Sequence, residues 1–421
     1  MRRRWSHWML RWLLLGMFAI LVTVGGWQRL TPATTATTTP LFEEAWKTVR
    51  DNFYDPNLNG VDWNAVRSHY QPIFGQAQTQ AEAAAVINDM LAELHTSHTH
   101  LYTPEEPAYY QLLGIFQPSM RDLPAAARQL FPNGRFEYTG IGIFTQTIDG
   151  KVFISGVLDG RPGAIAGLQV GDEIVAVENT SFHPIQSFAG KAGQAVKMQV
   201  RRTPNTLIEV SVTPQVLDTT TLFLEAQQDS ISIIEQDNKR IGYVHIWSNA
   251  ADPHQQTLLN ELMSGKLHDA DALVLDLRDG WGGGDLDYLN FFTGKGLTIL
   301  NRGRDRDPFT YATYWNKPAV MLINAGSRSS KEILAYGFQQ ERVGPLVGAA
   351  TAGAVVAGRP FLMQDGTLLY VAVADVLINQ SERLEGRGVR PDVEVIASIP
   401  YAQGADLQKE RAIATAIQAI Q

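Results

Sequence analysis

The spacing of apolar residues predicts helices at the start of the folded chain. In residues 41–53, bulky apolar side chains recur every three or four positions, the period of one helix face: Phe42, Trp46, Val49 and Phe53. The stretch 81–94, AEAAAVINDMLAEL, repeats this pattern. We therefore expect a helical N-terminal domain over residues 41–136, in which residues 102–136, with several prolines, form a connector of ambiguous structure.

Short runs typical of β-strands replace this periodicity from residue 137. They are rich in β-branched and other apolar residues: TGIGIFTQT, KVFISGVL, DEIVAVE, AVKMQVRR and IEVSVTP. Between them, RPGAIAGLQVGD predicts a short helix followed by a tight turn. We expect a separate β domain over residues 137–216.

Strands alternate with helices from residue 217 onward. The apolar runs IGYVHIW, ALVLDLR and PAVMLIN predict strands, and the segments between and after them predict helices over 254–263, 286–292 and 331–340. This alternation is typical of a mainly parallel sheet with helices on both faces. A last β stretch, GTLLYVAVADVLI, precedes an amphipathic C-terminal helix. The expected fold class is a multidomain α/β protein with an α/β core over residues 217–421.

The first 27 residues have the pattern of an export signal. Residues 1–11 carry four arginines and no acidic residue, and residues 12–27 form an uncharged apolar run. No clear small-residue cleavage site follows, which favours an uncleaved signal anchor over a cleaved signal peptide. The basic end is expected to stay in the cytoplasm, so the remaining chain should lie outside it, joined to the membrane through a Thr/Pro-rich linker over 28–40.

Composition narrows the possible chemistry. The 421 residues include 35 basic and 43 acidic side chains, a formal net charge of −8, which argues against a nucleic-acid partner. The chain has no cysteine, so disulfides, thiol nucleophiles and thiolate metal sites are excluded. The sequence predicts no particular oligomeric state.

A glycine-rich turn in the β domain is a candidate peptide-binding site. Residues Gly140-Ile141-Gly142-Ile143 open a strand, and the N–H groups of such a turn can hold a terminal carboxylate while the strand edge accepts an added strand. Downstream, residues 160–174 resemble the signature of PDZ domains, a short helix and then Gly-Asp-x-Ile. A generic small β domain is the alternative interpretation.

Two loops that follow strands of the α/β part contain candidate catalytic groups. In residues 276–284, DLRDGWGGG, glycines free N–H groups for an oxyanion hole or a phosphate, although no Gly-Lys-Ser/Thr of a nucleotide loop follows. Residues 324–333, NAGSRSSKEI, place serines at a strand-to-helix turn, where free N–H groups and the helix dipole stabilise negative charge. Ordinary helix capping is the alternative role for such a serine.

Residues 95–100, HTSHTH, form a third candidate. Three histidines suggest a metal site, but only Glu93 lies nearby to complete a ligand set, and we expect no metal and no cofactor. A histidine beside a hydroxyl residue can instead act as a general base, and a histidine packed in the core is the remaining alternative. Because none of the nine histidines follows His268, a base for a serine in 324–333 must come from an earlier part of the chain or be a lysine.

In this order, the motifs resemble the C-terminal processing, or tail-specific, serine peptidase family over about residues 41–400. The resemblance rests on the helical start, the PDZ-like insert, DLR-x-x-x-GG, Ser-x-Ser-x-x-Glu-Ile and Glu-Gly-x-Gly-Val-x-Pro-Asp. It implies a ClpP/crotonase-like α/β peptidase core, with Ser329 as nucleophile and the N–H groups of Gly283 and Ser330 holding the oxyanion. The processing branch uses a lysine base, and the matching position in this sequence is Ala354.

The tricorn-core branch of the family supplies its base differently, from a Ser-His pair supported by a glutamate. Ser97-His98 resembles that pair and Glu385 resembles that glutamate. The resemblance implies that His98 takes the Ser329 proton and that Ser97 and Glu385 support the imidazolium. Lys331 is a less favoured base, because two residues after Ser329 on a starting helix it points elsewhere.

The prediction is an exported serine endopeptidase that recognises polypeptides with free or unstructured C-termini through its PDZ-like domain. Two alternatives stay open. One is an inactive binder of peptides or lipophilic ligands on the same fold, as the retinoid-binding proteins of vertebrate photoreceptors resemble copies of this fold. The other is a scaffold that uses only its PDZ-like domain.

Overall fold

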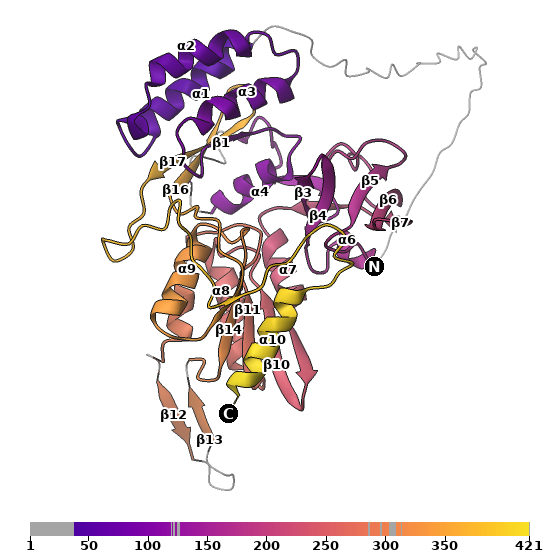
Figure 1. Ribbon diagram of the computed structural model, residues 1–421, viewed down its shortest axis with the longest axis vertical. Coiled ribbons are helices and arrows are strands. Elements are labelled where there is room, and N and C mark those ends of the chain that lie inside the picture. The colour runs from indigo at the N-terminus through magenta and orange to yellow at the C-terminus, as the bar shows by residue number, and fades with distance from the viewer. Residues whose placement is uncertain are drawn as a thin grey trace, which may run out of the picture. The chain divides into compact units, whose positions relative to one another are not determined.

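The N-terminal region is helical, as its periodicity predicts (Figure 1). The computed structural model describes residues 38–118, 120, 123, 127–284, 287–294, 297–302, 309–312 and 314–420. The helices are α1 (Thr38–Asn52), α2 (Trp63–Phe74) and α3 (Gln80–Ala92), with a 3₁₀ turn η1 (Leu58–Gly60) between the first two. Trp46 Nε1–H donates to the carbonyl of Trp63 and Trp63 Nε1–H to that of Trp46, at 2.9 and 3.1 Å, which joins α1 to the start of α2.

The predicted signal anchor over residues 1–27 lies outside the described residues. Among the helices that the structure describes, none has both the length and the apolar character needed to cross a membrane. The anchor therefore stays a prediction.

The connector that follows contains two elements, β1 (His100–Tyr102) and α4 (Pro107–Phe116). Pro107 stands at the start of α4, where its fixed φ and missing N–H cost nothing. β1 pairs antiparallel with β17 (Leu368–Ala374), which pairs with β16 (Ala357–Leu362). The last β stretch therefore leaves the parallel sheet of the core and joins the N-terminal region instead.

Residues 137–218 form the β elements expected from the sequence. A five-stranded antiparallel sheet has the order β3-β4-β5-β6-β7. Its strands are Ile143–Ile148, Lys151–Val157, Glu173–Val177, Val196–Thr203 and Thr206–Val212. The short helix α6 (Pro162–Ile165) lies between β4 and β5, and β2 (Glu137–Gly140) pairs with β8 (Gln215–Asp218) where the chain enters and leaves this part.

The core is a six-stranded sheet of order β18-β15-β14-β11-β10-β9, parallel except for the edge strand β9. Its strands are β9 (Ser232–Gln236), β10 (Lys239–His245), β11 (Ala272–Asp276), β14 (Ala319–Ile323), β15 (Leu346–Gly348) and β18 (Val393–Glu394). Every residue of β11 and β14 is buried, because helices cover both faces of the sheet.

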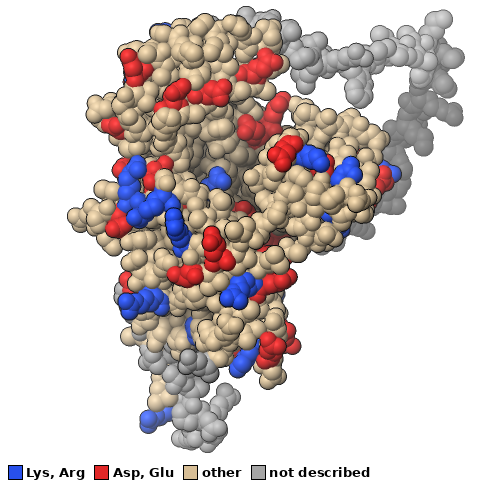
Figure 2. Space-filling model, viewed as in Figure 1, with Lys and Arg blue, Asp and Glu red and all other residues tan. Residues whose placement is uncertain are grey.

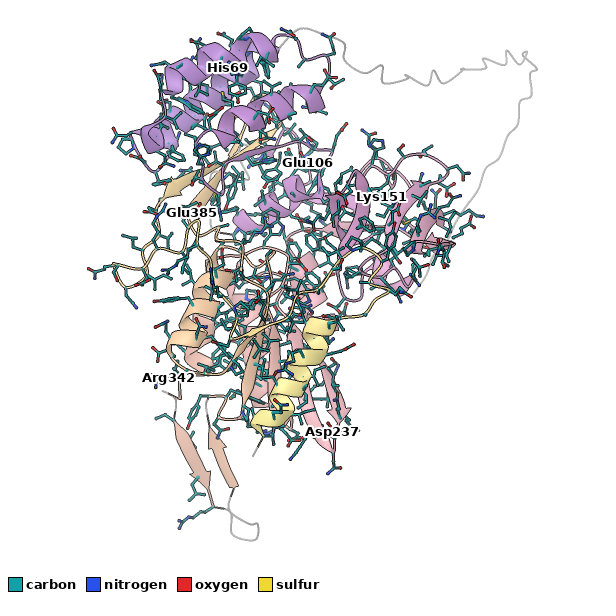
Figure 3. All side chains as sticks on the ribbon, viewed as in Figure 1. His69, Glu106, Lys151, Asp237, Arg342 and Glu385 are labelled. Atoms are coloured by element: carbon teal, nitrogen blue, oxygen red, sulfur yellow. The ribbon has the colours of Figure 1, made fainter. Side chains whose placement is uncertain are left out.

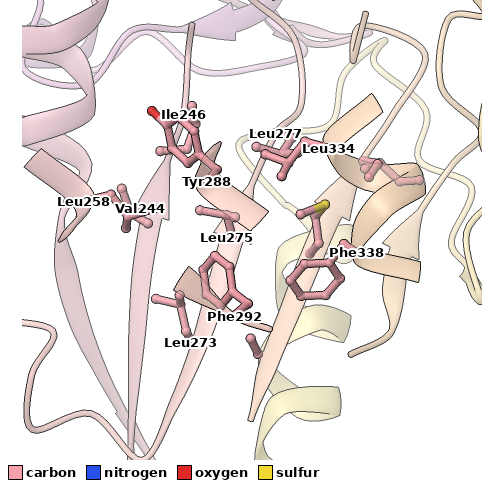
Figure 4. Packing of buried hydrophobic residues seen from close by; sticks show 14 of the residues in the cluster. Val244, Ile246, Leu258, Leu273, Leu275, Leu277, Tyr288, Phe292, Leu334 and Phe338 are labelled. Carbon is pink, nitrogen blue, oxygen red and sulfur yellow. The ribbon is translucent and has the colours of Figure 1, made fainter. Parts of the chain in front are cut away.

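Alternate residues of the central strands pack against opposite layers. On one face, Leu273 and Leu275 join a cluster with residues of α8 (Asp252–Met263), the 3₁₀ helix η2 (Asp287–Phe291) and α9 (Ser330–Gln340) (Figure 4). On the other face, Ala272 and Val274 pack with α10 (Leu407–Ala419). The remaining elements are α7 (Leu222–Ser230), which packs on β10, and the hairpin of β12 (Thr298–Asn301) and β13 (Phe309–Ala312).

A buried charge network ties the start of α10 to the sheet. The Arg278 guanidinium donates to Asp276, whose side chain is fully buried, and to both carboxylate oxygens of Asp406 at 2.7 Å. Just before α10, residues 399–404 cross the β domain, where Tyr401 N–H donates to the Gly171 carbonyl at 2.9 Å. One segment therefore attaches both the β domain and α10 to the core.

Replacing Arg278 with alanine is expected to lower the free energy of unfolding by about 3–5 kcal/mol, because the buried Asp276 would lose its partner. Arg383 is the matched control: its ion pair with Asp375 is solvent-exposed, and Arg383→Ala should change stability by no more than about 0.5 kcal/mol. Urea unfolding of the three proteins measures the difference, and equal midpoints would contradict the expectation.

Candidate active site

Ser329, the nucleophile that the family resemblance predicts, lies at the turn between β14 and α9. Its φ of 58° and ψ of −130° are unusual for a residue with a side chain, and such strain persists only where surrounding contacts hold it. Its N–H donates to the Ala354 carbonyl at 2.8 Å and to Glu332 Oε2 at 3.2 Å. The Ala354 contact places the position of the family lysine directly beside Ser329.

Glu332 holds this loop against the start of α9. Its fully buried carboxylate accepts hydrogen bonds from the Thr351 hydroxyl at 2.5 Å and from the N–H groups of Gly353 and Ala354 at 2.7 and 2.8 Å. Burial raises the pKa of Glu332, and these hydrogen bonds oppose the rise. Glu332 thus positions the loop 351–354. This loop supplies no base, because the position of the family lysine is occupied by Ala354.

His98 carries the hydrogen-bonded support that the resemblance implies. The Ser97 hydroxyl donates to Glu385 Oε2 at 2.9 Å, and Ser97 Oγ lies 2.8 Å from His98 Nδ1. Because the single hydroxyl proton is given to Glu385, Ser97 Oγ accepts from His98 Nδ1–H, which leaves Nε2 as the unprotonated nitrogen. Glu385 also accepts from the N–H groups of Ser97 and Val355, at 2.8 and 2.6 Å. In Figure 3, Glu385 lies between the β16–β17 hairpin and α9.

The surroundings of His98 keep its ring neutral. Burial lowers the pKa of His98 to about 4, the charge of Glu385 works against this, and the charge of Arg328 lowers the pKa further. A neutral imidazole at neutral pH is the form that accepts a proton.

His98 and Ser329 line one cavity of about 350 Å³. The cavity is mostly apolar, with walls from α4 (Leu112, Ile115 and Phe116) and from the residues after Ala354. Figure 2 shows a recess in this face of the molecule between the N-terminal helices and the core. Among the described residues no hydrogen bond joins His98 to Ser329, although both residues line the same cavity.

The predicted oxyanion donors lie beside Ser329, but one of them has a partner. Gly283 N–H donates to Ser330 Oγ at 2.6 Å, and the Ser330 hydroxyl donates to Asn249 Oδ1 at 2.7 Å. Gly283 N–H must leave Ser330 Oγ before it can bind a substrate oxygen. Asn249 was not predicted from the sequence, since nothing in its local pattern marks it.

The glycine loop lies so close to Ser329 that a methyl group at Gly282 would displace the serine. A Cβ there would lie 2.6 Å from Ser329 Cβ, whereas a Cβ at Gly284 would have no neighbour within 4 Å. If Ser329 is the nucleophile, Gly282→Ala should lower kcat/KM about 10²-fold and Gly284→Ala should change it little. Steady-state cleavage assays on both variants test this, and equal effects would contradict it.

Lys331, His95 and His100 are not members of the hydrogen-bonded series Glu385–Ser97–His98. Lys331 is fully buried, and its Nζ donates to the carbonyls of Trp247 and Asp279 at 3.1 and 2.7 Å, so it points away from Ser329 as predicted. His95 is exposed, and His100 Nε2 lies 3.3 Å from Asn88 Nδ2. Within the described ranges, no three His, Asp or Glu side chains come together in a group that could hold a metal.

A second cavity, of about 220 Å³, lies at the predicted peptide-binding turn. Gly140, Ile141, Gly142 and Ile143 line it, and its lining also includes Phe182, Pro184 and Phe188. Gly163 N–H and Leu158 N–H donate to the carbonyls of Ile141 and Gly142, which fixes the turn. Trp281 lines both cavities, and its Nε1–H donates to Gln111 Oε1 at 2.8 Å.

Comparison with known proteins establishes the family. Residues 240–395 match the model of peptidase family S41, and residues 36–92 match the tricorn protease C1 domain. The chain carries a family S41 peptidase domain. The predicted membership of the C-terminal processing peptidase family is thereby confirmed, and the match indicates a serine peptidase. Its assignment to the tricorn-like branch remains a prediction.

This S41 peptidase is similar to relatives of both branches. It is 27% identical to a putative tricorn protease homolog 2 of Streptomyces coelicolor, over 90% of this chain and 32% of that protein. It is 24% identical to the carboxyl-terminal-processing protease of Synechocystis, over 89% of this chain and 85% of that protein. The chain therefore spans about a third of the tricorn homologue and most of the processing protease.

The fold of this S41 peptidase matches solved structures. The photosystem II D1 C-terminal processing protease superposes with a TM-score of 0.50 at 20% identity, covering 88% of this chain and 98% of that protein. This likeness confirms the predicted fold class, a helical N-terminal region with an α/β peptidase core. The domain boundaries at residues 136 and 216 remain predictions.

Proposed function

We propose that this chain is an exported serine endopeptidase of the C-terminal processing type, with Ser329 as nucleophile and His98 as general base. The observation that carries the proposal is the series Glu385–Ser97–His98, which ends in the cavity that Ser329 lines. A serine that only caps α9 would need no general base with supporting hydrogen bonds. The lysine that serves as the base in the processing branch is absent, because position 354 is alanine.

In this mechanism His98 Nε2 takes the Ser329 proton as Oγ attacks the carbonyl carbon of the scissile bond. Ser97 and Glu385 stabilise the imidazolium, which returns the proton to the leaving amine. Water then repeats the sequence and releases the acyl group. The oxyanion forms at the N-terminus of α9, where Ser330 N–H and the released Gly283 N–H donate to it.

The β domain is proposed to bind the chain end of the substrate in the second cavity. Gly140–Ile143 would hold the terminal carboxylate through backbone N–H groups, and the edge of β3 would accept the chain as an added strand. Because Trp281 lines both cavities, a chain held there lies next to the catalytic cavity.

Phe182→Asp is expected to weaken binding of a peptide with an apolar end and a free carboxylate about tenfold. The substitution places a negative charge in the apolar wall of the cavity, close to the negative charge of the peptide carboxylate. Leu207→Asp is the matched control, since Leu207 is half-exposed on β7 of the same domain and outside the cavity lining. Fluorescence anisotropy on the Ser329→Ala protein measures binding without turnover. Equal weakening by both variants would contradict the proposed groove.

A second candidate is a catalytically inactive binding protein on the same fold. Two observations favour it: no hydrogen bond joins His98 to Ser329 among the described residues, and Gly283 N–H is directed to Ser330 Oγ. Turnover of an unfolded polypeptide with a free C-terminus by the full chain separates the candidates. Cleavage supports the peptidase, whereas binding without cleavage by folded protein would overturn it.

The proposed location is outside the cytoplasm, with residues 1–27 as a membrane anchor. It rests on the charge pattern of that segment and on the similarity to processing proteases. Fractionation of cells that express the full chain or a chain beginning at residue 41 tests it, and identical soluble fractions would contradict the anchor.

A further inference from the structure

Arg328 is the charged residue of the catalytic cavity. It directly precedes Ser329, and the other described residues that line this cavity are apolar or neutral, His98 included. The two glutamates of the candidate site bind other groups. Glu385 accepts hydrogen bonds from Ser97 and Val355, and Glu332 accepts them from the 351–354 loop.

The Arg328 guanidinium has no anionic partner among the described residues. Its Nε is buried without a hydrogen bond, and its Cζ lies 5.4 Å from the centroid of the Trp281 ring. Stacking on an aromatic face leaves the edge of a guanidinium free to bind a carboxylate through two parallel hydrogen bonds. Other buried or half-buried arginines of this chain show the usual alternative, as Arg278 and Arg202 pair with Asp276 and Asp172.

A cation kept half-buried in an apolar cavity without a partner costs free energy that a bound anion would recover. We infer that Arg328 is a specificity-determining residue that binds a carboxylate of the substrate beside the scissile bond. The inference rests on the proposed function and names the substrate class: polypeptides with a carboxylate within reach of the Ser329 cavity.

Two sources supply this chemistry. One is an acidic side chain close to the scissile bond. The other is a free C-terminus that itself enters the catalytic cavity, in which case only a short piece is removed. Both place a carboxylate against the free edge of the guanidinium, and matched peptides separate them.

The test measures kcat/KM of the full chain on internally quenched peptides that differ in one carboxylate. The first pair contrasts Glu with Gln at positions flanking the scissile bond in an amidated peptide. The second contrasts a free C-terminus with an amide in the Gln peptide. A charge-assisted hydrogen bond predicts a preference of about tenfold or more for the carboxylate member of one pair. That pair identifies the source.

Arg328→Gln is expected to reduce this ratio to about one, and Arg328→Lys to retain part of it, because lysine keeps the charge without the paired donors. Arg383→Gln, at an exposed ion pair, is the matched control and should keep the full ratio. No preference in the wild type, or a preference that survives Arg328→Gln, would overturn the inference.

Binding of the same peptides to Ser329→Ala protein, with and without Arg328→Gln, makes the inference testable without turnover. If the wild type cleaves no peptide but Arg328→Gln abolishes a carboxylate preference in binding, the proposed function fails and the role of Arg328 stands. If the wild type cleaves all peptides equally and binding shows no preference, the peptidase stands and the role of Arg328 fails.

Discussion

Ser329→Ala is expected to lower kcat/KM by about 10⁴-fold or more. The reason is that no acyl intermediate can form without Oγ, and only binding and oxyanion stabilisation would remain. The measurement is cleavage of an unfolded polypeptide with a free C-terminus. Ser264→Ala, at an exposed serine that ends α8, is the matched control and should cleave at the wild-type rate.

The peptide should still bind to the Ser329→Ala protein, because the substitution removes one oxygen atom from the cavity. Activity within about tenfold of the wild type would show that another group attacks the substrate, and Ser330 would then be the first to replace.

His98→Ala is expected to lower kcat/KM by about 10²–10⁴-fold, the usual contribution of a general base. His69→Ala, at an exposed histidine of α2, is the matched control. The double variant Ser329→Ala/His98→Ala should be no slower than Ser329→Ala alone, because the two groups act in one step. Additive losses would place His98 outside the chemical step.

The pH dependence of the wild type gives an independent reading of the base. Burial lowers the pKa of His98 to about 4, so its ring is neutral above that pH and protonated below it. kcat/KM should therefore fall as the pH drops through about 4 and stay level at neutral pH. Burial lowers the pKa of Lys331 to about 7, so a Lys331 base would instead lose activity below about pH 7. A fall near pH 7 that Lys331→Met removes would contradict the assignment to His98.

The central strands of the core could be predicted because each contains a run of consecutive apolar residues. β11 and β14 are buried on both faces, which requires uninterrupted apolar runs, and those runs stand out in the sequence. α4 was not predicted, since its residues are apolar on nearly every side and lack the polar face that marks a surface helix. The partner of β17 was also beyond prediction, because alternation along a strand does not specify which strand it meets.

Some residues of the candidate site could likewise be predicted from the sequence, and others could not. Ser97, His98, Ser329 and Glu385 could be singled out because short motifs carry them, and the structure brings Ser97, His98 and Glu385 into one hydrogen-bonded series. Arg328 and Trp281 lie in the loops 324–333 and 276–284, which the sequence also singles out, but their roles depend on a cavity that exists only after distant segments meet. The bond from Gly283 to Ser330 likewise follows from tertiary packing alone.

The pairing of β1 with β17 has a consequence for the order of events during synthesis. Ser97 and Glu385, joined in the folded protein by a 2.8 Å hydrogen bond, are 288 residues apart in the chain. A chain that emerges with its N-terminal end first presents His98 long before its supporting carboxylate exists. In the proposed mechanism the growing chain therefore stays latent until almost all of it has been made. Peptidase activity is expected only after Glu385, near the C-terminal end, packs against Ser97 near the beginning.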